Sequence, residues 1–156
     1  MARYAGQIAA RQGRRCTCVT QVINGDKTAK RPRDYKSLDI RQRASRYSLR
    51  AIRLYRFLEK GKDGAGWILG KQYLRSATSI GANIEEAQSA ETKADFIHKY
   101  GIAQKEAKES LYWLRLMTES GTVKAARLQP LMKETEELYA VITAIIVKSK
   151  RRSSRP

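Results

Sequence analysis

The residues best suited to chemistry in this sequence are four arginines that follow one another at steps of three, four and three residues: Arg43, Arg46, Arg50 and Arg53. On an α-helix this spacing places side chains along a single face, which we expect to lie away from the apolar residues of the same helix. A row of guanidinium groups can follow the phosphates of a nucleic acid without reading its sequence. The alternative is a solvated charged face, which covers the outside of many helices.

The charge of the whole chain favours the first interpretation. Over 156 residues, 32 Lys and Arg outnumber 15 Asp and Glu, which leaves a net charge of +17 and a field that attracts polyanions. Most of this charge lies near the two ends, because residues 38–147 retain only +5. We therefore add basic residues near both ends to the candidates for nucleic-acid binding: Arg14, Arg15, Lys30, Arg31, Arg33, Lys148, Lys150, Arg151 and Arg152.

The sequence contains no recognisable set of catalytic or metal-binding residues. A di-iron centre in a helical bundle needs two Glu-x-x-His pairs and two further carboxylates, whereas the single histidine, His98, has only Asp95 at that spacing. There is no phosphate-binding loop and no zinc motif. Cys16 and Cys18 are too close together to form a framework disulfide, and too few to bind a metal by themselves. We expect no enzymatic activity and no cofactor.

Four segments between residues 38 and 148 repeat apolar residues at steps of three and four, which is typical of amphipathic helices. Such helices, joined by short turns, bury their apolar faces together by packing nearly antiparallel. We predict an all-α, up-down antiparallel four-helix bundle at 38–148, with flexible basic tails at 1–37 and 149–156. The predicted core residues, in chain order, are Ala44, Tyr47, Ala51, Leu54, Leu58, Leu69, Tyr73, Ala77, Ile80, Ile84, Ala87, Phe96, Tyr100, Ala103, Ala107, Ser110, Leu114, Met117, Leu128, Leu131, Thr135, Leu138, Ile142 and Ile145.

Glycines and one cap indicate where these helices begin and end. The first helix is predicted to end near Gly61, and the third at Gly121. Thr92 with Asp95 three residues later is similar to a capping box and predicts the start of the third helix. Pro130 leaves the first turns of the fourth helix open, and this helix is predicted to reach about residue 148.

One segment carries a family resemblance. Residues 72–87 read QYLRSATSIGANIEEA and resemble the hallmark segment of bacterial four-helix-bundle proteins called 23S rRNA-intervening sequence proteins. Residues 93–97, KADFI, and 105–114, KEAKESLYWL, look like the third helix of that family. The resemblance covers residues 38 to about 147. It implies an up-down bundle that often assembles as a homopentamer, and a relationship to accessory proteins of diversity-generating retroelements, which bind nucleic acid and a reverse transcriptase.

Two further groups of residues lie beside the predicted core. Large apolar residues off the core stripes are candidates for an oligomer interface, although scattered exposed apolar residues are normal on any surface. They are Leu49, Phe57, Ile102, Tyr112, Trp113 and Leu116. The second group, in the family-like segment, is interpreted as structural, since small residues permit close helix approach and an amide can satisfy a buried polar contact. It consists of Ser76, Ser79, Gly81 and Asn83.

The sequence therefore predicts a non-enzymatic, oligomeric bundle that binds RNA or DNA electrostatically, as an accessory to RNA or to reverse transcription. A reverse transcriptase or another protein is a further partner that the family resemblance implies. The alternative is a protein-interaction scaffold that binds an acidic protein and has no direct role with nucleic acid. The longest apolar stretch falls well short of the roughly 20 residues needed to cross a bilayer, so we expect no membrane association and a cytoplasmic location.

Overall fold

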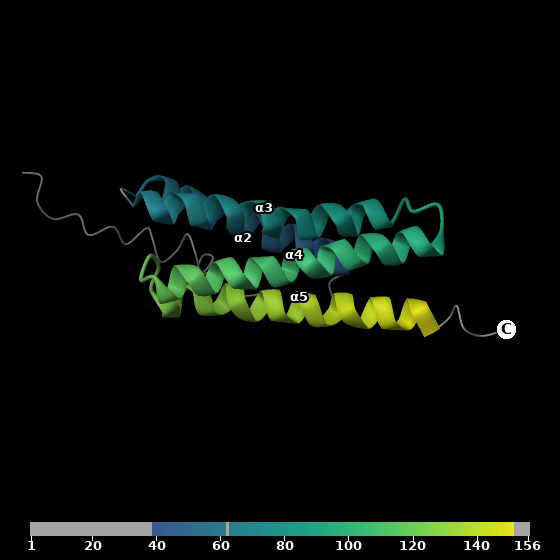
Figure 1. Ribbon diagram of the computed structural model, residues 1–156. Helices are drawn as coiled ribbons and strands as arrows, with labels where there is room; N and C mark the ends of the chain where they lie inside the picture. The colour runs from purple at the N-terminus through teal and green to yellow at the C-terminus, as the bar shows by residue number, and fades with distance from the viewer. Residues whose placement is uncertain (1–38, 62, 152–156) are drawn as a thin grey trace, which may run out of the picture.

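The computed structural model describes residues 39–61 and 63–151, which fold into four α-helices (Figure 1). No strand occurs in these two stretches, so the predicted all-α class is confirmed. The helices are α2 (Ile40–Glu59), α3 (Gly64–Ala87), α4 (Lys93–Glu119) and α5 (Ala125–Arg151).

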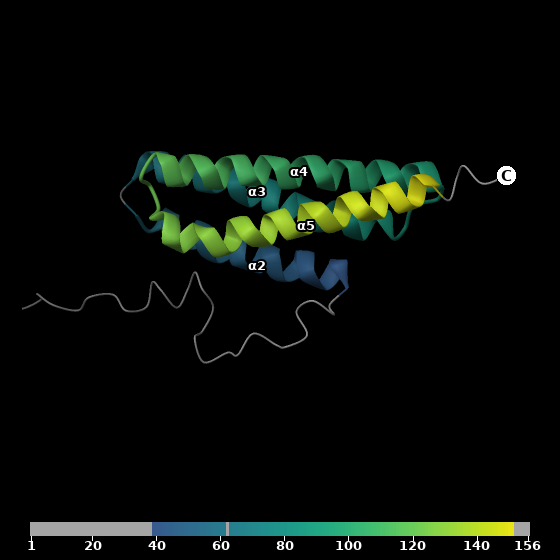
Figure 2. The ribbon, with the colours of Figure 1, turned by 90° about the horizontal axis from the view of Figure 1, so that it is seen from below.

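The four helices lie along a common long axis and reverse direction at each turn (Figures 1 and 2). Each helix packs against two neighbours, in the order α2, α3, α4, α5 and back to α2, while the backbones of the diagonal pairs stay further apart. The contact between α2 and α5 is the least extensive of the four. This is the predicted up-down antiparallel bundle.

The predicted helix ends agree with the structure to within two residues, except at the ends of α3 and α5. The second helix is predicted to run to about Ala90, but α3 ends at Ala87. The hydroxyl of Thr92 accepts a hydrogen bond from the backbone N of Asp95 at 3.1 Å, so the predicted cap of α4 is present. Gly121, just after α4, has a φ of 73°, a conformation that glycine adopts without strain. α5 includes Pro130 in its second turn and continues to Arg151, three residues beyond the predicted end.

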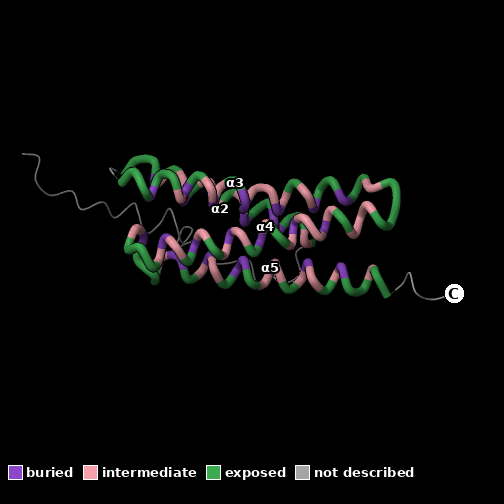
Figure 3. Tube along the Cα trace, in the orientation of Figure 1, coloured by how far each residue is buried: buried purple, intermediate pink, exposed green. Residues whose placement is uncertain are grey.

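The core follows the predicted stripes, with buried residues on the inner side of each helix and exposed residues outside (Figure 3). Every predicted core residue is buried except Leu69, Phe96 and Ile145, which are partly covered. In the last turns of α5 it is Ile146 that is buried. Among the described residues, α2 begins only at Ile40, so α5 extends beyond it (Figure 2) and no described helix covers the side of α5 that faces α2 there.

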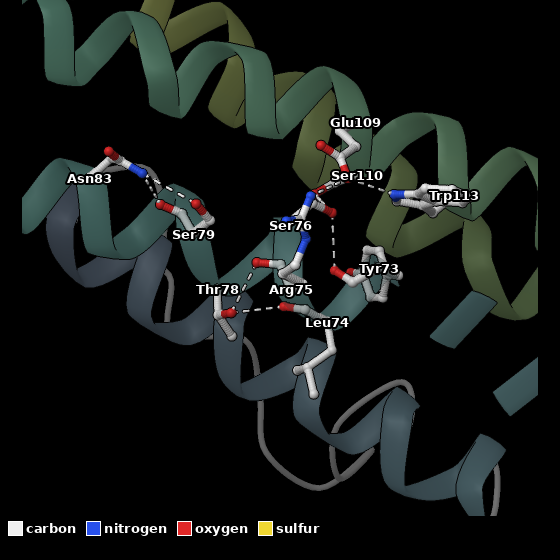
Figure 4. A network of polar contacts seen from close by, with 10 residues as sticks. All are labelled: Tyr73, Leu74, Arg75, Ser76, Thr78, Ser79, Asn83, Glu109, Ser110 and Trp113. Carbon is white, nitrogen blue, oxygen red and sulfur yellow. Dashed lines mark hydrogen bonds and ion pairs between the residues drawn. The ribbon is translucent and has the colours of Figure 1, made fainter. Parts of the chain in front are cut away.

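A layer of hydroxyl groups crosses the middle of this core. Tyr47 of α2 and Thr135 of α5 share a hydrogen bond of 2.7 Å, and the hydroxyl of Tyr73 in α3 donates to that of Tyr47 at 3.1 Å. Ser76 of α3 and Ser110 of α4 are joined at 2.9 Å, beside Tyr73 (Figure 4). All four helices thus contribute, and each buried hydroxyl has a partner. Burial raises the pKa of Tyr47 and of Tyr73.

The small residues of the family-like segment hold α3 close to its neighbours. A side chain at Gly81 would begin 3.4 Å from Oγ of Ser48 in α2, which leaves room for little more than a methyl group. Asn83 is half-buried and donates to the carbonyl oxygen and the hydroxyl of Ser79, in its own helix (Figure 4). These contacts agree with the structural interpretation of this segment.

Candidate nucleic-acid interface

The arginine row of α2 is divided between the surface and the boundary with α5. Arg46 and Arg53 are exposed, as predicted. Arg43 is only 8% exposed, and its Nη2 lies 3.0 Å from Oε2 of Glu137 in α5. Arg50 forms an ion pair with Glu134, a buried carboxylate of α5.

The prediction that all four arginines face away from the core is therefore wrong for Arg43 and Arg50. Both lie three or four residues from Tyr47, so they share the side of the helix on which that buried ring lies. Arg46 is the direct neighbour of Tyr47 and is rotated by about 100° around the helix axis, which brings it to the surface. The two inner arginines are used within the fold, where each neutralises a carboxylate of α5.

The exposed arginines of α2 extend beyond Arg53 to Arg56, a residue that sequence reasoning missed. Arg56 lies one turn beyond Arg53 and is also exposed, so that Arg46, Leu49, Arg53 and Arg56 form an outward row at steps of three, four and three. Within residues 39–61 and 63–151, no ion pair engages the three arginines of this row. Arg41, by contrast, is held by Glu85 of α3 at 2.8 Å, and this hydrogen bond raises the pKa of its guanidinium group. Arg56 could have been predicted from the sequence, because it follows Arg53 at a spacing of three residues.

A second basic group lies at the end of α5. Lys148, Lys150 and Arg151 are exposed in its last turns, where positive charge is favoured by the helix dipole. The remaining candidates fall outside the described part of the chain: Arg14, Arg15, Lys30, Arg31, Arg33 and Arg152.

The candidates for an oligomer interface also divide. Leu49 and Tyr112 are each 51% exposed, as expected for a contact surface. Phe57 and Trp113 are partly buried and pack against the core, so a monomer exposes Phe57 only in part. The indole N of Trp113 donates to Glu109 of its own helix at 3.1 Å (Figure 4). The other two candidates, Ile102 and Leu116, are partly exposed.

Sequence reasoning missed two exposed apolar residues on α3. Trp67 is 41% exposed and Ile68 is 55% exposed. Lys71 lies over the ring of Trp67, 5.5 Å from its centroid, and covers part of it. Both residues directly precede Leu69, the first predicted core residue of this helix. Their exposure could have been predicted, because neither lies on the core stripe that begins at Leu69.

The described residues contain no group of three or more His, Cys, Asp or Glu side chains arranged to hold a metal ion. His98 is exposed on α4, on the outward side where its position relative to the core stripe placed it. No helix in this part of the chain has the length and hydropathy needed to cross a membrane.

The family model of the 23S rRNA-intervening sequence protein matches residues 36–144, more than half of the chain. The chain belongs to this family. The predicted resemblance is thereby confirmed, and the family's hallmark segment forms most of α3.

A family relative has a similar solved structure. It is a protein of unknown function from the S23 ribosomal protein family of Bacteroides thetaiotaomicron, 36% identical in sequence, with a TM-score of 0.65. The similarity covers 69% of this chain and 98% of that one, so the shared unit is the bundle. No curated protein shows a significant match to the chain.

Proposed function

We propose that this protein is a non-enzymatic, oligomeric bundle that binds nucleic acid through its phosphates. The observation that carries the proposal is the outward row of α2, in which Arg46, Arg53 and Arg56 are exposed on one side of a rigid helix. In a chain of net charge +17, cations that are not used within the fold are available to polyanions.

The row supports binding without base recognition. Contacts from arginine to phosphate position a nucleic acid but carry no sequence information. The helix fixes the spacing of the three arginines along the backbone, so only their side chains lose conformational entropy when they bind phosphates. The basic residues near both ends of the chain add affinity for RNA and DNA alike. The protein would then act as an accessory to RNA or to reverse transcription.

Oligomerisation strengthens such binding. Exposed apolar residues on α3 and α4, Trp67, Ile68 and Tyr112, supply surface for contact between copies, and the family suggests a pentamer. A ring repeats the arginine row on every subunit, so that one nucleic acid engages several rows and dissociates more slowly. A reverse transcriptase or another protein is a further partner within this proposal.

Fluorescence anisotropy with single-stranded RNA and duplex DNA tests the role of the row. Replacing Arg46, Arg53 and Arg56 together with Gln should weaken binding to both and reduce the slope of log affinity against log salt by about 2–3, since each phosphate contact contributes about 0.9. The matched control removes three exposed cations elsewhere, by Arg115→Gln, Lys124→Gln and Lys133→Gln.

Two results would contradict the proposal. If the control variant loses as much affinity as the row variant, net charge alone governs binding and the row has no special place. If the intact protein binds neither nucleic acid at about 50 mM salt, where such contacts are strongest, the electrostatic proposal fails altogether. Light scattering of both variants must show the same particle size as the intact protein. If the intact protein itself has the size of a monomer, the proposal of an oligomer fails.

A further inference from the structure

The boundary between α4 and α5 carries an apolar strip on its outer side. A shallow hollow on the α5 side of this boundary is lined by seven residues of α5: Tyr139, Ala140, Thr143, Ala144, Val147, Lys148 and Arg151. Ala140 and Ala144 are exposed, and Val147 is 42% exposed although it is a large apolar residue. Every lining side chain is apolar, hydroxyl-bearing or positively charged, and none is a carboxylate.

Two contacts define how α4 borders this strip. Gln104 donates from Nε2 to Oγ1 of Thr143 at 2.6 Å, and Nζ of Lys108 lies 4.5 Å from the centroid of the Tyr139 ring. Gly101 lies one turn before Gln104 on the same side of α4, while Val147 lies one turn after Thr143. Because the two helices run antiparallel, Gly101 and Val147 occupy the same level of the boundary.

Gly101 has no packing partner within the described chain that would explain a glycine. A Cβ added there would meet nothing within 4 Å. The glycines inside α3 differ, since a Cβ at Gly70 would lie 2.7 Å from Leu58 and one at Gly81 would lie 3.4 Å from Ser48. Glycine inside a helix costs about 1 kcal/mol relative to alanine. Its usual compensation is that another chain can approach the bare backbone closely.

We propose that this α4–α5 groove is the docking site for an acidic amphipathic helix of another protein. The apolar side of that helix would lie on Gly101, Ala140 and Ala144, which together let it approach closely. Its acidic side chains would face Lys108, Lys148 and Arg151, the cations that border the strip. This goes beyond the proposed nucleic-acid binding, because the outward row of α2 takes no part in it.

The chemistry of the strip favours a helix over two other occupants, an unpaired nucleic-acid base and a second copy of this chain. Unpaired bases need open aromatic faces, but Lys108 already lies over the ring of Tyr139 and the rest of the strip is small and aliphatic. Ala140 with Ala144, and Thr143 with Val147, form ridges at a spacing of four residues, into which a second helix packs. A second copy that packs this same face against itself is disfavoured, because Lys108, Lys148 and Arg151 would then lie opposite the same cations of the other copy.

The test uses the full-length protein and two synthetic helical peptides of about 18 residues, or five turns. Both peptides share a stripe of Leu and Ala, which Glu borders in one and Lys in the other. Oligouridine RNA is the third probe. A Cβ at Gly101 meets nothing within 4 Å, so we expect Gly101→Leu to occupy the groove and the free protein to unfold at the same or a higher temperature. Gly64→Leu, also in open space but at the start of α3, is the matched control.

We expect the Glu peptide to bind at least about tenfold more tightly than the Lys peptide, a difference of about 1.4 kcal/mol. Gly101→Leu should remove most of that binding while Gly64→Leu retains it, and Ala144→Glu, on the exposed surface of α5, should repeat the loss. Equal binding of the two peptides, or unchanged binding to Gly101→Leu, overturns the proposal. It also fails if Gly101→Leu affects only oligouridine binding, which would indicate a nucleic-acid groove, or if it alters particle size, which would indicate a contact between copies.

Discussion

The two boundaries of α2 are built on different physical principles. Toward α3 the helices approach through small residues, and Gly81 lies against Ser48 and Ala44 with room for little more than a methyl group. Toward α5 the contact is less extensive and polar, with the Tyr47–Thr135 hydrogen bond at its centre and the pair of Arg50 and Glu134 beside it.

This difference shows how one helix can pack closely against α3 on one side and pair its charges with α5 on the other. A boundary set by steric fit tolerates no larger side chain, whereas a boundary set by charge depends on every partner being present. It also explains why α2 can carry so many arginines. Two of them complete the polar boundary with α5, and only the outer ones remain for other partners.

The largest effect should come from removing the buried carboxylate of the polar boundary. Glu134→Ala removes the buried carboxylate that pairs with Arg50 and should lower the free energy of unfolding by about 3 kcal/mol. Urea unfolding followed by circular dichroism measures this loss. Glu136→Ala, an exposed neighbour on the same helix, should stay within about 0.5 kcal/mol of the original protein.

The same experiment distinguishes pairing from packing. Replacing Arg50 with Met together with Glu134 with Leu should recover most of the loss, because apolar residues of similar volume often substitute for a buried ion pair. If Glu134→Ala behaves like Glu136→Ala, the boundary with α5 is not held by this pair, and the contrast between the two sides of α2 disappears.

A smaller loss should follow from enlarging the steric boundary. Gly81→Leu forces a branched side chain against Ser48 and Ala44 and should cost about 2 kcal/mol, a typical value for overpacking. Gly101→Leu places the same side chain in open space and should cost nothing. Thermal unfolding of the two variants side by side gives the comparison, and equal stability would show that α2 and α3 can move apart freely.

Removing one hydroxyl of the buried layer should cost less again. Tyr47→Phe deletes the bonds to Thr135 and Tyr73 while leaving the ring in place, and should lower the free energy of unfolding by about 1 kcal/mol. A double-mutant cycle with Thr135→Val isolates the bond between α2 and α5. Additive losses in that cycle would mean that the two hydroxyls do not stabilise one another.

The smallest effect concerns alkaline pH. Burial raises the pKa of Tyr47 and of Tyr73, so the folded protein favours the neutral phenols, while the unfolded chain loses these protons near the ordinary value of about 10. The contribution of these groups to stability is therefore complete below about pH 10 and is lost as the pH rises toward the raised values.

Urea unfolding at several pH values up to about 10.5 tests this expectation. The variant with Tyr47→Phe and Tyr73→Phe should show a shallower fall in the free energy of unfolding than the original protein. Tyr112→Phe, on the exposed side of α4, should leave the fall unchanged. A fall of the same steepness in all three proteins would assign the alkaline destabilisation to other groups.

The number of helices, their approximate bounds and nearly all core residues could be predicted from the sequence. The reason is that the spacing of three and four depends only on helix geometry, which is the same in every protein. The cap at Thr92 was predictable for the same reason, since both of its partners lie within one turn. The family resemblance likewise depends on short runs of residues within single helices.

Only the tertiary structure decided what depends on the place of a neighbouring helix. The spacing of Arg43 and Arg50 from Tyr47 is visible in the sequence, but only the structure shows that Glu137 and Glu134 of α5 lie beside them and pair with them. The burial of Ile146 depended on where α2 begins. The open surroundings of Gly101 also appear only when α4 and α5 lie side by side, because a sequence shows that a glycine is present but not what its missing side chain would touch.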